Sequence, residues 1–207
     1  MSVWLWWSSG KDSAWALHRL REEGLHVTGL VTTVNMRHER VAMHGVRRAL
    51  LEAQARAAGL PLEVVEIPHP CSNEEYEAAS AALIERARAR EVRQMAFGDL
   101  FLRDIRAYRE GLLAGTGIEP LFPLWSSDTA GLAREMQRGG LRAFVTCLDP
   151  KVLPRELAGR AFDAALLDEL PAGVDPCGEN GEFHSFAWDG PMFREPIPVR
   201  PGEVVER

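Results

Sequence analysis

The sequence predicts an α/β protein in which helices cover both faces of a parallel sheet. Short apolar runs rich in β-branched and aromatic residues alternate with longer stretches of helical periodicity, which is the pattern of successive βαβ units. The first run, Val3 to Trp7, is apolar along its length, as expected for a central strand that is buried on both faces. The second half of the chain changes in character and predicts a smaller α+β domain.

The expected elements follow one another in regular order through the first half. Two helical stretches are expected to end at Gly24 and Gly59, because glycine readily adopts the left-handed conformation that terminates a helix. Asn73 is expected to cap a further helix, since Glu74 and Glu75 follow it in the first turn, where the helix dipole favours acidic side chains. Strands are expected at 3–7, 27–34, 62–67 and 92–97, and helices at 12–23, 46–59, from 73 and around 105–112.

The second half begins with a proline-containing stretch. Pro120 and Pro123 interrupt the next apolar run, and a proline cannot donate a hydrogen bond to a central strand ladder. We therefore place a boundary near Gly115, with one domain over residues 1–115 and a second, smaller domain over 116–207. The second domain is expected to contain a helix at 128–138, a strand at 143–148, a short helix at 162–170 and an extended tail from residue 191.

The composition limits the functions that the chain can have. Of its 207 residues 46% are hydrophobic and 26% charged, as in a folded globular protein. The net charge of −6 is opposite in sign to that of most nucleic-acid-binding proteins and argues against such a partner. No apolar run reaches the roughly 20 residues of a membrane helix, and the N-terminal segment lacks the basic start of a signal peptide. Three isolated cysteines, Cys71, Cys147 and Cys177, argue against a disulfide framework and favour a cytoplasmic location.

The segment Ser8-Ser-Gly-Lys-Asp-Ser13 lies between the first expected strand and helix. Free backbone amides and the positive end of the helix dipole make such a position an anion site, to which Lys11 adds a positive charge. Phosphate is the natural ligand. The segment is not a Walker A loop, because Asp12 follows the lysine, and the dinucleotide pattern GxGxxG is absent. The alternative is an ordinary capped helix start.

A second polar segment, residues 175–184, combines acidic, glycine and histidine positions. Glu179, Glu182 and His184 fall within six residues, and the glycines between them allow the backbone to turn the side chains together. The segment could form a proton-transfer site or a site for a hard metal ion. It is not an EF-hand calcium loop, because the sixth position would be Asn180. A plain solvated loop is the alternative.

Together with the strand before it, residues 8–13 resemble the pyrophosphate loop of the N-type ATP pyrophosphatases, or PP-loop enzymes, in the adenine nucleotide α-hydrolase-like superfamily. The usual form is Ser-Gly-Gly-Lys-Asp-Ser, so Ser9 replaces the first glycine. Residues 179–185 and 189–193 resemble the C-terminal signature of the diphthine–ammonia ligase family. The resemblance extends over nearly the whole chain, through His44-Gly-Val46, Gln54-Ala55, Gly98-Asp99-Leu100 and the stretch from Glu119 to Trp125.

The resemblance implies a Rossmann-like nucleotide-binding domain and cleavage of ATP between its α and β phosphates. A carboxylate would be adenylated, pyrophosphate would leave into the loop, and ammonia would displace AMP to give an amide. Lys11 would offset charge on the leaving group, and Asp12 and Asp99 would hold Mg²⁺. The residues expected to bind the nucleotide are Ser8, Ser9, Gly10, Lys11, Asp12, Ser13, Thr32, His44 and Asp99.

The acidic segment would deliver the nitrogen nucleophile. Glu182 or Glu179 would bind ammonium and accept its proton, with His184 as an alternative base or as a group that orients the base. Asp99 could instead cap the following helix, and His44 could be an ordinary surface histidine. The expected catalytic residues are Lys11, Asp12, Glu179, Glu182 and His184.

The resemblance leaves the carboxylate substrate open. A composition rich in Ala, Arg, Leu and Gly suits a high-GC bacterial genome, so we expect a bacterial homologue that acts on a carboxylate other than diphthine. One alternative is a tRNA-modifying PP-loop enzyme, although neither a cysteine pair nor a basic domain supports it. Another is a regulatory module that binds ATP without turnover, which the serine at position 9 favours. The sequence also leaves open whether the chain forms a homodimer.

Overall fold

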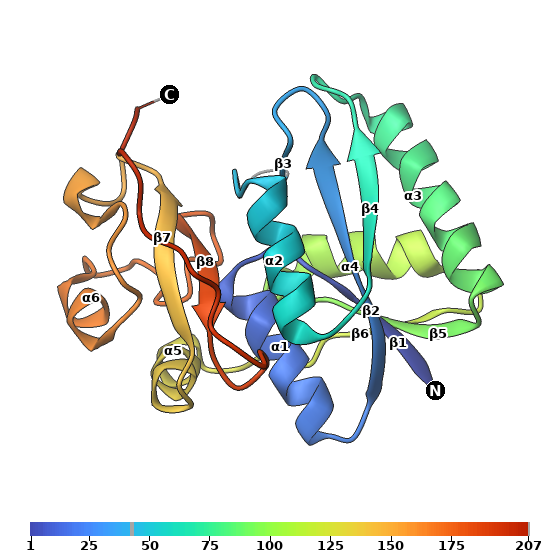
Figure 1. The fold of residues 1–207 in the computed structure, drawn as a ribbon, viewed down its shortest axis with the longest axis horizontal. Helices are drawn as coiled ribbons and strands as arrows, with labels where there is room; N and C mark the ends of the chain where they lie inside the picture. Colours follow the sequence, from blue (N-terminus) through green and yellow to red (C-terminus); the bar gives the residue numbers. More distant parts are fainter. Residues whose placement is uncertain (42–43, 207) are drawn as a thin grey trace.

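The computed structural model describes residues 1–41 and 44–206, and its first part is built on a six-stranded sheet (Figure 1). The strands are β1 Ser2–Trp6, β2 His26–Asn35, β3 Arg40–Val41, β4 Leu62–Ile67, β5 Val92–Ala96 and β6 Glu119–Leu121. Strands β4, β2, β1, β5 and β6 are parallel and lie in that order, while the short β3 pairs antiparallel with the end of β2. The α/β prediction is therefore confirmed.

Helices cover both faces of this sheet. They are α1 Lys11–Glu22, α2 Arg48–Ala58, α3 Asn73–Ala89 and α4 Arg103–Leu113. Helices α1 and α2 share a core with Val3 and Leu5 of β1, whereas α3 and α4 share a second core with Trp4. Alternate side chains of a strand point to opposite faces, so β1 contributes to both cores.

Two details of the first part differ from the sequence predictions. Helix α3 is capped by Ser72 and not by Asn73, because the Ser72 hydroxyl accepts from the Glu75 amide while the Glu75 carboxylate accepts from the Ser72 amide. The sequence pattern predicts no strand around Pro120, yet β6 pairs with β5 there. A proline is tolerated at this position because β6 is an edge strand. The first sheet thus continues beyond Gly115, and a domain division at that residue stays a prediction.

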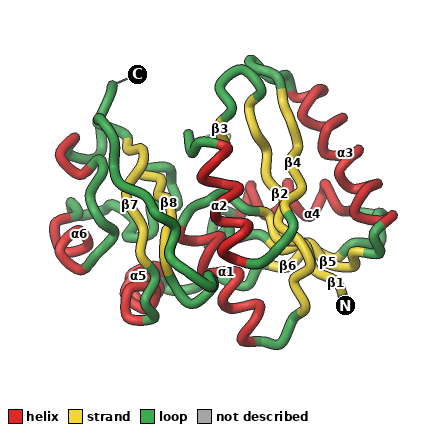
Figure 2. Tube along the Cα trace, in the orientation of Figure 1, coloured by secondary structure: helices red, strands yellow, loops and turns green. Residues whose placement is uncertain are grey.

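The second part contains a two-stranded antiparallel sheet flanked by short helices (Figure 1). Its elements are α5 Thr129–Arg138, β7 Arg142–Leu148, the 3₁₀ helix η1 Arg155–Leu157, α6 Ala164–Glu169 and β8 Phe183–Asp189. The sequence predicts α5, β7 and α6 but not β8. The tail contains no helix or strand over residues 190–206 (Figure 2), as expected.

Strand β8 joins the two parts of the molecule. The Ala187 amide donates to the carbonyl oxygen of Ser9 at 3.0 Å, and the Arg194 amide in the tail donates to the carbonyl oxygen of Ala57 in α2 at 2.8 Å. Side chains of β8 and of α1 belong to the same hydrophobic core. The loop before α1 is therefore held directly against the second part. Within the described residues, no helix has the length and apolar character needed to cross a membrane.

Candidate active site

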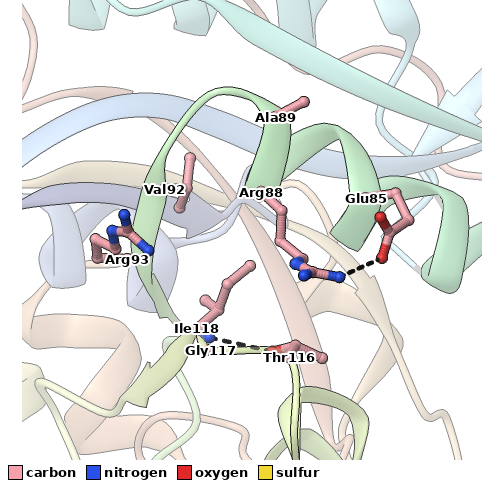
Figure 3. Close-up of a pocket in the computed structure, with 8 residues that line it drawn as sticks. All are labelled: Glu85, Arg88, Ala89, Val92, Arg93, Thr116, Gly117 and Ile118. Atoms are coloured by element: carbon pink, nitrogen blue, oxygen red, sulfur yellow. Dashed lines mark hydrogen bonds and ion pairs between the residues drawn. The ribbon is translucent and has the colours of Figure 1, made fainter.

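Two cavities lie at opposite ends of the parallel strands. The larger, of about 490 Å³, lies beside Val92 at the start of β5 and Ile118 before β6 (Figure 3). Its Arg88 side chain is already paired with Glu85 at 2.9 Å, as the dashed line in Figure 3 shows. Open α/β sheets bind ligands at the carboxyl ends of their strands, and this cavity lies at the other end.

The second cavity, of about 350 Å³, lies at the carboxyl ends of β1, β2 and β5. Strand β8 and the loop before it form its opposite wall. The sequence-predicted site residues in its lining are Ser8, Gly10, Lys11, Asp12, Ser13, Thr32, His44, Asp99, Glu179 and His184. Two predicted residues, Ser9 and Glu182, lie outside the lining. We take this cavity as the candidate active site.

Hydroxyl groups hold the loop at residues 8–13 in a tight turn. The Ser8 hydroxyl donates to that of Ser13 at 3.1 Å, which in turn donates to the carbonyl oxygen of Gly10 at 3.0 Å. Ser9 has a φ of 70°, in the left-handed region, and its hydroxyl is buried without a hydrogen-bond partner among the described residues. The position therefore has the backbone conformation that glycine adopts most easily, and serine occupies it with strain.

Lys11 is a buried cation at the start of α1. Its side chain is 2% exposed, and its Nζ lies 2.8 Å and 3.0 Å from the two carboxylate oxygens of Asp12 and in contact with the carbonyl oxygen of Cys177. Burial alone would lower the pKa of Lys11, but the neighbouring Asp12 carboxylate raises it above its ordinary value. Lys11 therefore stays protonated and links the first loop to the loop before β8.

Glu179 lies in the cavity and joins the acidic loop to the end of β5. Its Oε1 accepts a hydrogen bond from the backbone amide of Leu100 at 2.7 Å. Burial, opposed by this hydrogen bond and reinforced by the charges of Asp12 and Asp99, raises the pKa of Glu179 to about 7. Near neutral pH, both the ionised and the protonated carboxyl group are thus accessible, which suits proton transfer.

Glu182 stabilises the acidic loop from outside the cavity. Its Oε1 accepts hydrogen bonds from the backbone amide of Asp175 at 3.0 Å and from the side-chain amide of Asn180 at 2.9 Å. Burial would raise the pKa of Glu182, but these hydrogen bonds hold it below its ordinary value. The geometry therefore makes Glu182 a group that fixes the loop around Glu179.

The two predicted histidines lie in contact with each other in the cavity lining. The ring centroids of His44 and His184 are 4.5 Å apart. Burial, with the nearby His184 and Lys11, lowers the pKa of His44 to about 3, and burial also lowers the pKa of His184. Both rings are consequently neutral near pH 7. His44 lies in a turn, because α2 begins at Arg48 and not at residue 46 as predicted.

Several residues shape the site although the sequence analysis assigns them no role. The hydroxyl of Ser185 accepts from the backbone amide of Lys11 at 3.1 Å, and the side-chain amide of Gln54 donates to the carbonyl oxygen of Ser9 at 3.0 Å. A Cβ atom at Gly98, just after β5, would lie 3.1 Å from the Ser13 nitrogen, so a side chain there would push the start of α1 away by a few tenths of an ångström. The signature stretches include Ser185, Gln54 and Gly98, but the sequence offered no signal for Arg109, which also lines the cavity.

The cavity has features that fit a nucleotide and its metal ion. The Thr32 hydroxyl and one carboxylate oxygen of Asp99 are buried in the described structure without a hydrogen-bond partner, and both residues line the cavity. Over residues 1–41 and 44–206, no group of three or more His, Cys, Asp or Glu side chains is arranged to hold a metal ion by itself. Mg²⁺ is usually held by one or two carboxylates together with substrate phosphates, and the carboxylates of Asp12 and Asp99 both line the cavity.

Comparison with known proteins places both parts of the chain in one family. Residues 1–119 match the family model of the diphthamide synthase N-terminal domain, and residues 128–206 match that of the diphthamide synthase C-terminal domain. The diphthine–ammonia ligase of Rattus norvegicus is 24% identical over 223 residues, which cover 96% of this chain and 82% of the relative. The Homo sapiens protein of the same name is 27% identical over 173 residues, covering 81% of this chain and 65% of the relative.

The chain also has a distant likeness to a solved structure. It is the predicted subunit of a tRNA methyltransferase from Methanocaldococcus jannaschii, which is 18% identical and aligns with a TM-score of 0.46. The alignment covers 70% of this chain and 80% of that one. At this distance the likeness does not bear on function.

Proposed function

The chain belongs to the diphthamide synthase family, and from this premise we propose that it is an ATP-dependent ligase that converts a carboxylate into an amide. Several relatives are named diphthine–ammonia ligase, which is the name of an enzyme that performs such a reaction. The observation that carries the proposal is the lining of one cavity. The PP-loop residues Lys11 and Ser13, which suit a leaving pyrophosphate, line it together with Glu179, which suits proton transfer from an ammonium ion.

The first half-reaction takes place at the loop before α1. The backbone around Gly10 and the N-terminus of α1 would bind the β and γ phosphates, and Lys11 would offset the charge that develops on pyrophosphate as it leaves. Thr32, on the β2 side, would contact the nucleoside. Asp12 and Asp99 would hold Mg²⁺, which when bound neutralises phosphate charge.

The second half-reaction uses the acidic loop. Ammonium binds beside ionised Glu179, which accepts one proton, and the resulting ammonia attacks the acyl carbon of the adenylate. The acyl–phosphate bond breaks, AMP leaves, and the nitrogen gives up a second proton to solvent as the amide forms, so the sum is carboxylate, ammonium and ATP going to amide, AMP, pyrophosphate and two protons. We assign the base to Glu179 and not to Glu182, because Glu182 lies outside the lining and is engaged with Asp175 and Asn180.

The proposal is tested by following products from the purified protein with ATP, Mg²⁺, ammonium and a panel of carboxylates. Diphthine in its protein context belongs in the panel because relatives are named for it. We expect AMP, pyrophosphate and amide in equal amounts with the right carboxylate. Tight ATP binding without AMP formation for any carboxylate would contradict the proposal and favour a regulatory ATP-binding module.

A further inference from the structure

We propose that Arg109 binds the carboxylate of the acceptor substrate. The rings of Trp6 and Phe97 form the floor of this subsite, and Tyr76 lines its side. The inference deepens the proposed function and rests on it. It specifies an acceptor that carries an apolar or planar group beside its carboxylate. The subsite lies on the α3 and α4 side of the cavity, across the end of β1 from the PP-loop.

The Arg109 side chain is held in place but lacks a full set of partners. Its guanidinium carbon lies 5.2 Å from the ring centroid of Trp6 and 5.0 Å from that of Phe97, so the aromatic faces fix its position. Nε forms an ion pair with a carboxylate oxygen of Asp99 at 3.6 Å, a distance that is too long for a hydrogen bond. Nε of Arg109 and Oδ2 of Asp99 are both buried without a hydrogen-bond partner in the described part of the chain. An added anion would satisfy the guanidinium.

Arg109 is less fully engaged than Lys11, because its ion pair with Asp99 is longer than a hydrogen bond. Both cations line the cavity. Lys11 is already engaged by Asp12 and by the carbonyl oxygen of Cys177. A guanidinium also presents two parallel N–H groups that match a carboxylate, which an ammonium group cannot do.

The leaving pyrophosphate and the attacking carboxylate are expected on opposite sides of the cavity, each next to a different face of the sheet. Trp7 of the PP-loop side belongs to the core shared with α1 and α2, whereas Trp6 and Tyr76 pack on the core shared with α3 and α4. Phosphoryl and nucleotidyl transfer proceed with the attacking and leaving oxygens roughly in line. If pyrophosphate leaves toward α1, the attacking carboxylate approaches from the other side, where Arg109 lies.

The side-chain Nε–H resonance of Arg109 provides a direct test on the full chain. Arg109→Lys identifies the signal by its loss, and benzoate serves as the probe with benzamide as its uncharged analogue. With a non-hydrolysable α,β-methylene analogue of ATP and Mg²⁺ already bound, we expect benzoate to shift this resonance and benzamide to leave it unchanged. A resonance that moves with the nucleotide analogue and not with benzoate would overturn the proposal.

Arg106 is the matched control for this experiment. It lies on the same helix and stacks 4.7 Å from the ring centroids of both Phe122 and Trp125, but it is paired with Glu110 and lies outside the cavity lining. Its resonance should not respond to benzoate. An equal response of Arg106 and Arg109 would show nonspecific binding of the carboxylate and overturn the assignment.

Kinetics with the true acceptor separate this proposal from the proposed function. In ATP–pyrophosphate exchange, Arg109→Lys should raise the KM for the carboxylate by about tenfold or more, while the dissociation constant for ATP changes by less than about threefold. Arg106→Lys should leave both constants near those of the wild type. An equal loss of ATP affinity in Arg109→Lys would place Arg109 in the nucleotide site. If the wild-type protein makes no pyrophosphate but benzoate still shifts the Arg109 resonance, the proposed function fails and the carboxylate subsite stands.

Discussion

Glu179 and Glu182 have the same side chain but different surroundings. Glu179 accepts one backbone hydrogen bond and lies in the cavity near Asp12 and Asp99, so its proton is retained up to about pH 7. Glu182 accepts two hydrogen bonds within its own loop, which favour its ionised form. A carboxylate that stays ionised and engaged is a poor proton acceptor, whereas one that titrates near neutral pH is a good one.

Glu179→Gln is therefore expected to abolish amide formation while ATP binding persists. In the wild type, amide formation should increase as pH rises through about 7, because Glu179 becomes ionised and can accept a proton. The measurement is the pH dependence of amide release, with isothermal titration for ATP. Glu182→Gln is the matched control, and it should retain the same pH dependence and lose about 1 kcal/mol of unfolding free energy through weaker loop bonds. Loss of amide formation in Glu182→Gln alone would reverse the assignment.

Ser9 is the residue at which this chain departs from the usual PP-loop sequence. A left-handed conformation costs an L-residue roughly 1 kcal/mol, and its buried hydroxyl has no hydrogen-bond partner among the described residues. The carbonyl oxygen of Ser9 nevertheless accepts hydrogen bonds from both Gln54 and Ala187. The surrounding contacts thus stabilise a conformation that serine itself disfavours.

Ser9→Gly should accordingly raise the unfolding free energy, by up to about 1 kcal/mol, because it removes both the strain and the buried hydroxyl. The gain is limited because glycine also increases the entropy of the unfolded chain. Urea denaturation measures the change. Ser9→Ala separates the two effects, since it removes the hydroxyl but keeps the strain. A lower stability of Ser9→Gly than of the wild type would show that neither effect operates.

The elements with regular periodicity could be predicted closely from the sequence. The expected helix at 12–23 corresponds to α1, and the expected strand at 62–67 is β4. The missed elements depend on partners distant in sequence: β6 is a strand because β5 lies beside it, and β8 because β7 does. The cap of α3 was predicted one residue late, although Ser72 and Glu75 already have capping-box spacing in the sequence.

In the candidate site too, contiguous motifs could be predicted from the sequence, whereas contacts between segments far apart in the chain could not. The motif at 8–13 and the acidic segment could be found because each is contiguous in sequence. Their meeting in space depends on β8, which no local pattern indicated, and it gives Lys11 a contact with Cys177. The assignment of Arg109 to the lining depends on the packing of α4 against Trp6 and Phe97, so the sequence alone could not reveal it.

The histidine pair couples the turn before α2 to β8, and it predicts a loss of stability in mild acid. Because folding lowers the pKa of His44 from 6.5 to about 3, the unfolded chain binds more protons between these values, and unfolding becomes easier as pH falls through this window. Between pH 7 and pH 5 the unfolding free energy should fall by about 2 kcal/mol more in the wild type than in His44→Gln.

Urea denaturation at several pH values measures this difference. His26→Gln is the control for removal of a histidine, because His26 is exposed at the start of β2 and does not line the cavity. The same pH dependence in the wild type and in His44→Gln would contradict a neutral buried ring at this position.

One buried side-chain amide, that of Gln54, connects the end of β1 and the PP-loop in the first part of the molecule to β8 in the second part. Gln54 is fully buried in α2 and accepts a hydrogen bond from the indole nitrogen of Trp7 at 2.9 Å. Its Nε2 donates to the carbonyl oxygens of Ser9 and of Ala187, at 3.0 Å and 2.6 Å. The PP-loop and β8 therefore share a donor, so the nucleotide side and the acidic loop side of the cavity are positioned by the same side chain.

Gln54→Leu should consequently impair both stability and nucleotide binding, although leucine has a similar size. The substitution leaves the Trp7 indole N–H and the Ser9 carbonyl oxygen short of a buried partner, which should lower the unfolding free energy by roughly 2–4 kcal/mol. ATP affinity should fall as well, because the loop loses one of the two donors that fix the Ser9 carbonyl oxygen. Arg155→Gln is the control, since it breaks an exposed ion pair with Glu206 that should contribute less than about 1 kcal/mol. If Gln54→Leu proves as mild as Arg155→Gln in urea denaturation and in ATP titration, then the backbone hydrogen bonds of β8 suffice to hold the two parts together and the shared amide is dispensable.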